Sequence, residues 1–242
     1  IVKILGNTFF FDGDLKKEKE PTSDLISEVL GNARKAAAAG PVDTLTEEHL
    51  WDIQEYYEQQ FAGTPYLNAL SGYWDEACEL APRLQPRDRA QLFSVLWGRH
   101  EAFTNLYITL LEALKQLGFA SEAYCPLDAL IPKQSSIIDV ATLAGLGNPA
   151  SAGSLQIRAQ QGVPVTLPRP VITALVAELR IVLKDKPYSF FDHTDLLDFP
   201  GARSRQKLNL ADFLEKEEAL KETFLRGRVA YLFDRYVAEQ EL

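Results

Sequence analysis

Apolar residues recur every three or four positions through most of the first half of the chain, which is the spacing of amphipathic helices. A first helix is expected after Thr22 and before Gly40-Pro41, because a capping hydroxyl precedes it and a helix breaker follows. A second is expected to begin at a capping box formed by Thr44 and Glu47.

Two further helices are expected before the pattern changes. One spans about Tyr66 to Leu80, and the longest covers residues 92–117, where leucine and aromatic side chains form one broad stripe. Gly118 is predicted to end it, since glycine is the usual residue after a helix C-terminus. Residues 1–130 are therefore predicted to form a helical region.

Residues 131–242 show shorter apolar runs, separated by proline and glycine. They predict a strand over residues 136–143, a hairpin over 155–167, an apolar helix over 171–183 and a strand that ends at Asp198. Strands that alternate with helices are typical of a three-layer α/β sheet. We therefore expect a helix-rich α/β protein, with a partial α/β region after the helical one.

Charge and composition exclude several classes of protein. The chain of 242 residues carries a net charge of −9, so it lacks the basic stripe of a nucleic-acid surface. Apolar runs stay well short of the roughly 18–20 residues of a membrane-spanning helix. Two cysteines, Cys78 and Cys125, are too few and too distant for a disulfide framework or a zinc site, and both are expected to be small buried residues.

Candidate chemistry lies where the last predicted strand ends, in Asp198-Phe199-Pro200-Gly201. In P-loop GTPases a carboxylate at such a strand end holds a Mg²⁺-bound water, and a glycine three residues later offers its backbone N–H to the terminal phosphate. Asp198 and Gly201 have this spacing, and glycine permits close approach of the backbone to an anion. Arg203 and Arg205 follow, and a guanidinium there could reach a phosphate or a partner's carboxylate.

Simpler readings of the same residues stay open. Asp198-Phe199-Pro200-Gly201 also fits a strand-to-loop turn, and the two arginines also fit a solvated surface. A four-ligand metal site is not expected, because alternation along a strand would place Asp192 and Asp198 on one face but His193 and Asp195 on the other.

Three runs resemble the SrfC-type putative bacterial virulence factor family: Ile1–Phe10, Leu196–Arg205 and Phe224–Tyr236. Members of that family are longer and are similar to P-loop GTPases. The resemblance implies an internal fragment that contains part of a P-loop-type parallel sheet and a large helical bundle or insertion. It also implies protein partners in a virulence-associated complex, and a place in the bacterial cytoplasm or, for a secreted effector, outside the cell.

The phosphate loop itself is missing from these residues. No G-x-x-x-x-G-K-[ST] and no N-K-x-D occurs, so the isolated fragment is expected to hold no cofactor. In the parent protein, Mg²⁺ with GTP or ATP is expected, with Asp198 holding the metal through water, and nucleoside triphosphatase activity only in that context. The alternative is a non-catalytic helical interaction or scaffold module, a pseudo-GTPase, in a virulence or defence complex.

Overall fold

The computed structural model describes residues 2–4, 22–60, 62–63, 65–99, 101–131, 136–147, 153–181, 184–185 and 188–193. Its helical unit consists of α1 (Ser23–Ala36), α2 (Glu47–Gln60), α3 (Pro65–Ala69), α4 (Trp74–Leu80), η1 (Ala81–Arg83), α5 (Pro86–Phe93), η2 (Ser94–Trp97) and α6 (Glu101–Gln116). Its sheet unit consists of β1 (Val2–Ile4), β2 (Glu122–Tyr124), η3 (Leu127–Leu130), η5 (Val140–Gly147), β3 (Ser154–Ala159), β4 (Val165–Pro168), α7 (Arg169–Leu175) and β5 (Val176–Leu179).

Helix α1 begins where the sequence predicts. The Thr22 hydroxyl accepts a hydrogen bond from the Leu25 backbone N–H at 3.2 Å, which satisfies one of the free donors of the first turn. One face is buried against the rest of the unit: Ile26, Val29, Leu30 and Ala33. The helix ends at Ala36, a few residues before Gly40-Pro41.

Helix α2 is capped by a different pair of residues from the predicted one. The helix starts at Glu47, and the Thr46 backbone N–H donates to His49 Nδ1 at 3.1 Å. His49 therefore takes the place that the capping box gives to glutamate, two residues later than the predicted Thr44 and Glu47. The shift arises because Asp43 is drawn inward to a buried arginine and Leu45 is itself buried.

The two later helices predicted from the sequence, over residues 66–80 and 92–117, are each interrupted in the structure. The expected helix over residues 66–80 is divided into α3 and α4 by a turn, in which Tyr73 N–H bonds to Leu70 C=O at 3.0 Å. The buried Tyr73 hydroxyl donates to the carbonyl of Leu92 at 3.0 Å. This tertiary contact fixes the turn and overrides the local periodicity.

The expected long helix ends early at Gly98, whose φ of 61° is left-handed. Arg99 N–H bonds to Ser94 C=O at 2.7 Å across this residue, so α5 and η2 end and α6 restarts at Glu101. Gly118 closes α6 in the same way, as predicted: its φ is 64°, and Phe119 N–H bonds to Leu114 C=O at 2.8 Å. This pairing is the Schellman arrangement.

The five strands form one sheet in the order β4-β3-β2-β1-β5, and each of its four pairs is antiparallel. The predicted hairpin over residues 155–167 is confirmed as β3 and β4, with Leu155 opposite Leu167. Side chains of β3 alternate between buried and exposed, so one face of the sheet is covered. No parallel pair occurs within the described ranges, so the parallel P-loop-type sheet is not shown.

Three elements predicted after residue 130 differ from those in the structure. Residues 136–143 form turns that lead into η5, because Thr142 Oγ1 donates to Ser136 C=O at 2.7 Å and local bonds of this kind compete with a strand. The apolar stretch from residue 171 ends as a helix at Leu175, and β5 then pairs with β1. The approach to Asp198 begins as a 3-10 helix, η7 (Ser189–Asp192), where a strand was expected.

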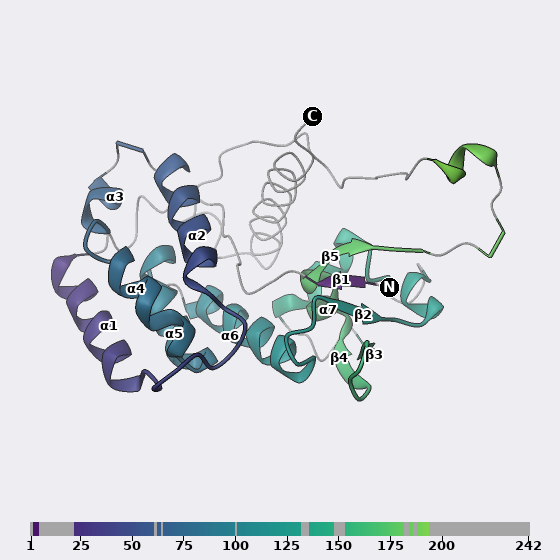
Figure 1. The fold of residues 1–242 in the computed structure, drawn as a ribbon, viewed down its shortest axis with the longest axis horizontal. Coiled ribbons are helices and arrows are strands. Elements are labelled where there is room, and N and C mark those ends of the chain that lie inside the picture. The colour runs from purple at the N-terminus through teal and green to yellow at the C-terminus, as the bar shows by residue number, and fades with distance from the viewer. Residues whose placement is uncertain are drawn as a thin grey trace.

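Figure 1 shows α1–α5 grouped at one end and the strands at the other, with α6 between them. Helix α6 packs against α5 on one side and against α7, which contacts β4, on the other. The sheet takes strands from both sides of residue 130, since β1 and β2 pair with each other and with later strands. The predicted boundary between regions 1–130 and 131–242 stays a prediction.

Candidate functional site

The residues proposed from the sequence as a nucleotide switch, Asp198, Gly201, Arg203 and Arg205, lie outside the described residues. Asp192 and His193, just before them, are described and exposed. No group of three or more His, Cys, Asp or Glu side chains with metal-binding geometry occurs in the part of the chain that the structure describes.

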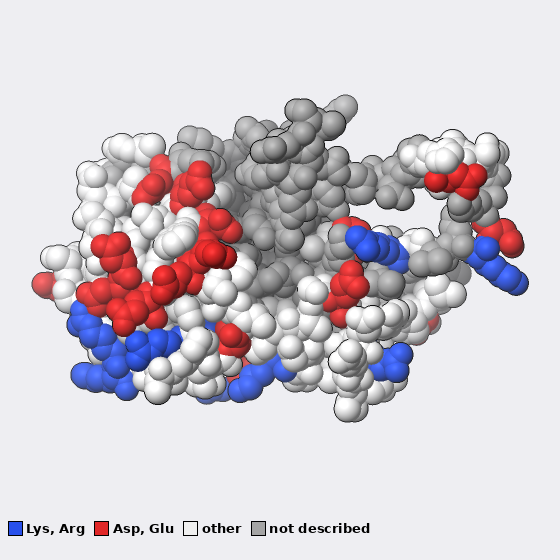
Figure 2. Space-filling model, in the orientation of Figure 1, with Lys and Arg blue, Asp and Glu red and all other residues white. Residues whose placement is uncertain are grey.

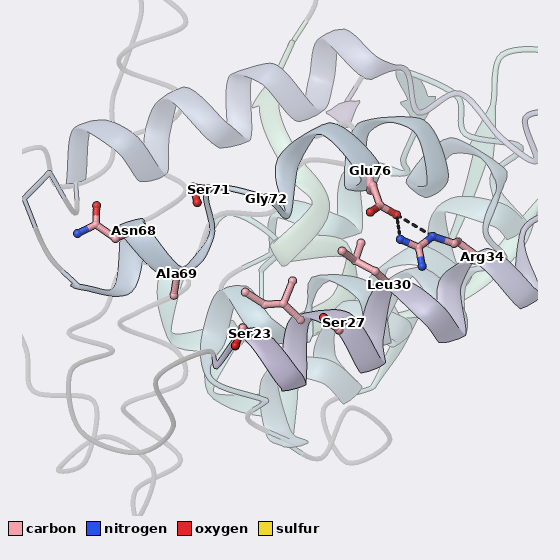
Figure 3. A pocket seen from close by; sticks show the side chains of 10 residues that line it. Ser23, Ser27, Leu30, Arg34, Asn68, Ala69, Ser71, Gly72 and Glu76 are labelled. Carbon is pink, nitrogen blue, oxygen red and sulfur yellow. Dashed lines mark hydrogen bonds and ion pairs between the residues drawn. The ribbon is translucent and has the colours of Figure 1, made fainter.

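The structure contains a groove between α1 and the α3–α4 turn, with a volume of about 620 Å³. Figure 3 shows α1 on one side of it and the α3–α4 segment on the other. Ten residues line it: Ser23, Ile26, Ser27, Leu30, Arg34, Asn68, Ala69, Ser71, Gly72 and Glu76. A volume of this size lies within the usual range of ligand sites.

The wall formed by α1 follows from helical spacing. Ser23 and Ser27 are four residues apart, as are Ile26 and Leu30, so hydroxyls and apolar side chains run side by side along the helix. Opposite them, Ser71 and its neighbours in the turn contribute small polar groups and backbone. The groove is therefore half apolar and half polar, with neutral hydrogen-bonding groups along most of its length.

An ion pair marks one end of the groove. Arg34 Nε–H donates to Glu76 Oε2 at 2.8 Å, and its Nη2 contacts the same oxygen. Both side chains are exposed, so the pair contributes at most about 1 kcal/mol to stability. The pair joins α1 to α4 and holds the two opposite charges together at this end of the groove (Figure 3).

Buried polar contacts hold the helices behind the groove. The Arg89 guanidinium lies 2.7 Å from an Asp43 carboxylate oxygen, and their side chains are 0% and 1% exposed. Arg89 Nε–H also donates to the carbonyl of Ala81 at 2.9 Å. Burial raises the pKa values of the Tyr73 and Tyr107 hydroxyls, so both stay protonated and neutral near neutral pH.

Acidic side chains gather on a second surface of the helical unit. Figure 2 shows a band of them across this unit, with the basic side chains mostly along its lower edge. Helix α2 carries five carboxylates and neither lysine nor arginine, namely Glu47, Glu48, Asp52, Glu55 and Glu58. The exposed Trp51 lies among them.

Sequence reasoning missed both surfaces. The Ser23/Ser27 and Ile26/Leu30 spacing is visible in the sequence, but the opposite wall depends on the α3–α4 turn, where the sequence predicts a helix. The cysteine prediction is confirmed for Cys78, which is free and buried, whereas Cys125 is free and only half-buried.

These observations define a helix-rich protein with an antiparallel sheet. No helix in the described part is long and apolar enough to cross a membrane. A search of curated proteins and a search of solved structures each found no match. A family model described as "Putative bacterial virulence factor" matches residues 1–242. The chain belongs to this family.

Proposed function

We propose that this chain is a protein-binding module of a bacterial virulence factor, with the groove between α1 and the α3–α4 turn as its binding site. The groove carries this proposal because its lining suits recognition and lacks the groups of a catalytic site. None of its ten lining residues is histidine, cysteine or lysine, and its one carboxylate, Glu76, is engaged by Arg34. A serine hydroxyl needs an adjacent base to act as a nucleophile.

An extended peptide segment of a partner fits this lining. Peptide N–H and C=O groups would bond to Ser23, Ser27 and Ser71, and a small apolar side chain would cover Ile26 and Leu30. Arg34 at the end is paired with Glu76, so this end carries no net charge. The occupant is therefore an extended segment with a small apolar side chain.

The test selects peptides from a random library on the purified chain and measures their affinity for variants. Ser27→Arg fills the groove, whereas Asn32→Arg adds the same side chain to an exposed position of α1 that does not line it. We expect Ser27→Arg to weaken binding at least about tenfold, a loss of about 1.4 kcal/mol. Asn32→Arg should leave affinity within about twofold. Selected peptides that bind both variants equally well would refute the groove as the site.

A second function is favoured by the sequence Asp198-Phe199-Pro200-Gly201. We propose that, in the parent protein, Asp198 holds Mg²⁺ through water and the Gly201 backbone N–H meets the terminal phosphate of GTP or ATP. Arg203 and Arg205 would then contact phosphate or a partner carboxylate. This proposal rests on residue order and on the family resemblance alone.

Its test is equilibrium binding of fluorescent GTP and ATP to the intact parent protein, with and without Mg²⁺. Asp198→Ala should abolish Mg²⁺-dependent binding, while Asp195→Ala, a neighbouring carboxylate, should retain it. Equal binding by the parent and by Asp198→Ala would refute the nucleotide-switch proposal. The protein-binding proposal would then remain.

A further inference from the structure

Trp51 is exposed in a way that the packing of α2 does not explain. Its side chain is 57% exposed, whereas the chain's other two tryptophans, Trp74 and Trp97, are buried. The opposite face of α2 provides the packing, through Leu50, Ile53 and Tyr57. Tryptophan is one of the residue types enriched among the hot spots of protein interfaces.

Carboxylates surround Trp51 on its own helix. Glu47 and Glu48 lie one turn before it and Glu55 one turn after it, so their side chains flank the indole along the helix surface. Asp52 follows it directly, and all four are exposed.

Helix α4 brings a further acidic group, Asp75, to the same place. Helix α2 packs on α4. Burial raises the pKa of the Cys78 thiol of α4, the negative charges of Glu47 and Asp75, one from each helix, raise it further, and the neighbouring Trp51 lowers it. Of the three carboxylates of α4, Glu76 pairs with Arg34 and Glu79 with Arg83, so Asp75 is the one that adds negative charge beside α2.

We propose that the Trp51 face, which comprises Glu47, Glu48, Trp51, Asp52, Glu55 and Asp75, docks an arginine- or lysine-bearing segment of a separate partner protein. A guanidinium stacked on the indole gains a cation–π contact, and the carboxylates around it match its charge. The face extends the protein-binding function to a second surface. It is distinct from the groove, since none of its residues lines the groove.

The occupant we infer is a segment of another protein, whose basic side chains complement the carboxylates around Trp51.

The test is fluorescence anisotropy of a labelled peptide of alternating arginine and glycine on the full chain, with the glutamate–glycine peptide as a charge control. Because Trp51 is the exposed tryptophan, quenching of indole fluorescence reports contact with it directly. Three variants are compared: Trp51→Ala, the double variant Glu48→Lys/Asp52→Lys, and the control Asp128→Lys on η3. Circular dichroism confirms that each is folded.

We expect Trp51→Ala to weaken binding about three- to fivefold, the size of an exposed cation–π contact. The double charge reversal should weaken it about tenfold, and added salt should weaken the wild type too. Asp128→Lys and Ser27→Arg should change affinity less than about twofold. Equal losses in Trp51→Ala and Asp128→Lys, or no quenching by the arginine peptide, would overturn the proposal. Loss through Ser27→Arg alone would assign the peptide to the groove instead. A concentration-dependent dimer that Trp51→Ala abolishes would make a second copy the occupant and overturn it too.

Discussion

Arg89 is the residue that the helical unit can least easily lose. Its guanidinium lies against Asp43 and donates to two carbonyls, those of Ala81 and Leu84. These groups come from the segment before α2, from η1 and from the turn before α5, so one side chain joins three connections. Because all of this is buried, removing the cation would leave a carboxylate and two carbonyls without their partner.

Arg89→Met is predicted to lower the free energy of unfolding by about 3–5 kcal/mol, the usual cost of breaking a buried ion pair from one side. Urea denaturation followed by circular dichroism measures it. The matched control is Arg87→Met, whose exposed partner Glu112 lies 3.8 Å away, and it should cost less than about 1 kcal/mol. A loss under about 1 kcal/mol for Arg89→Met would mean that the pair contributes little.

At the scale of elements, the sequence predicts the buried faces and the ends of helices better than it predicts whether a helix is continuous. The sequence predicts the end at Gly118, where a glycine follows the last residue of the apolar stripe, but not the one at Gly98, because leucine and aromatic residues continue on both sides of it. Both adopt the same left-handed backbone. Only the three-dimensional packing, in which the Tyr57 hydroxyl donates to Leu96 C=O at 3.1 Å beside the break, distinguishes an interrupted helix from a continuous one.

The sites too depend on three-dimensional packing that the sequence does not show. Ser27 and its neighbours on α1 have a visible spacing, but a groove needs its second wall, which a long-range turn provides. The Trp51 face could not be predicted from the sequence without knowing that α4 packs beside α2. Asp198 and Gly201 could be proposed from spacing alone, and they stay a prediction.

A matched pair of glycine substitutions tests the helix ends. Gly118→Ala should destabilise the chain by about 1–2 kcal/mol, because an L-residue strains the left-handed position that closes α6. Gly31→Ala, inside α1 with no atom within 4 Å of the added methyl, should stabilise it by about 0.5–1 kcal/mol. Urea denaturation gives both values. The same sign for both changes would contradict the described backbone.

At the scale of the whole molecule, α6 lies between the helical unit and the sheet unit and packs against both. On one side lie the helices that form the groove and the Trp51 face, and on the other lies α7 with the antiparallel sheet. Both proposed binding surfaces belong to the helical unit (Figures 1 and 2). The account therefore assigns partner binding to α1–α5 and a supporting role to the described sheet.

Amide hydrogen exchange of the full chain, with and without a selected peptide, tests this assignment most directly. The account predicts slower exchange in α1 and in the α3–α4 turn, and unchanged exchange in β3 and β4. The Ser27→Arg variant should show no such slowing with the same peptide. Protection of β3 and β4 with none in α1 would contradict the assignment of partner binding to the helical unit.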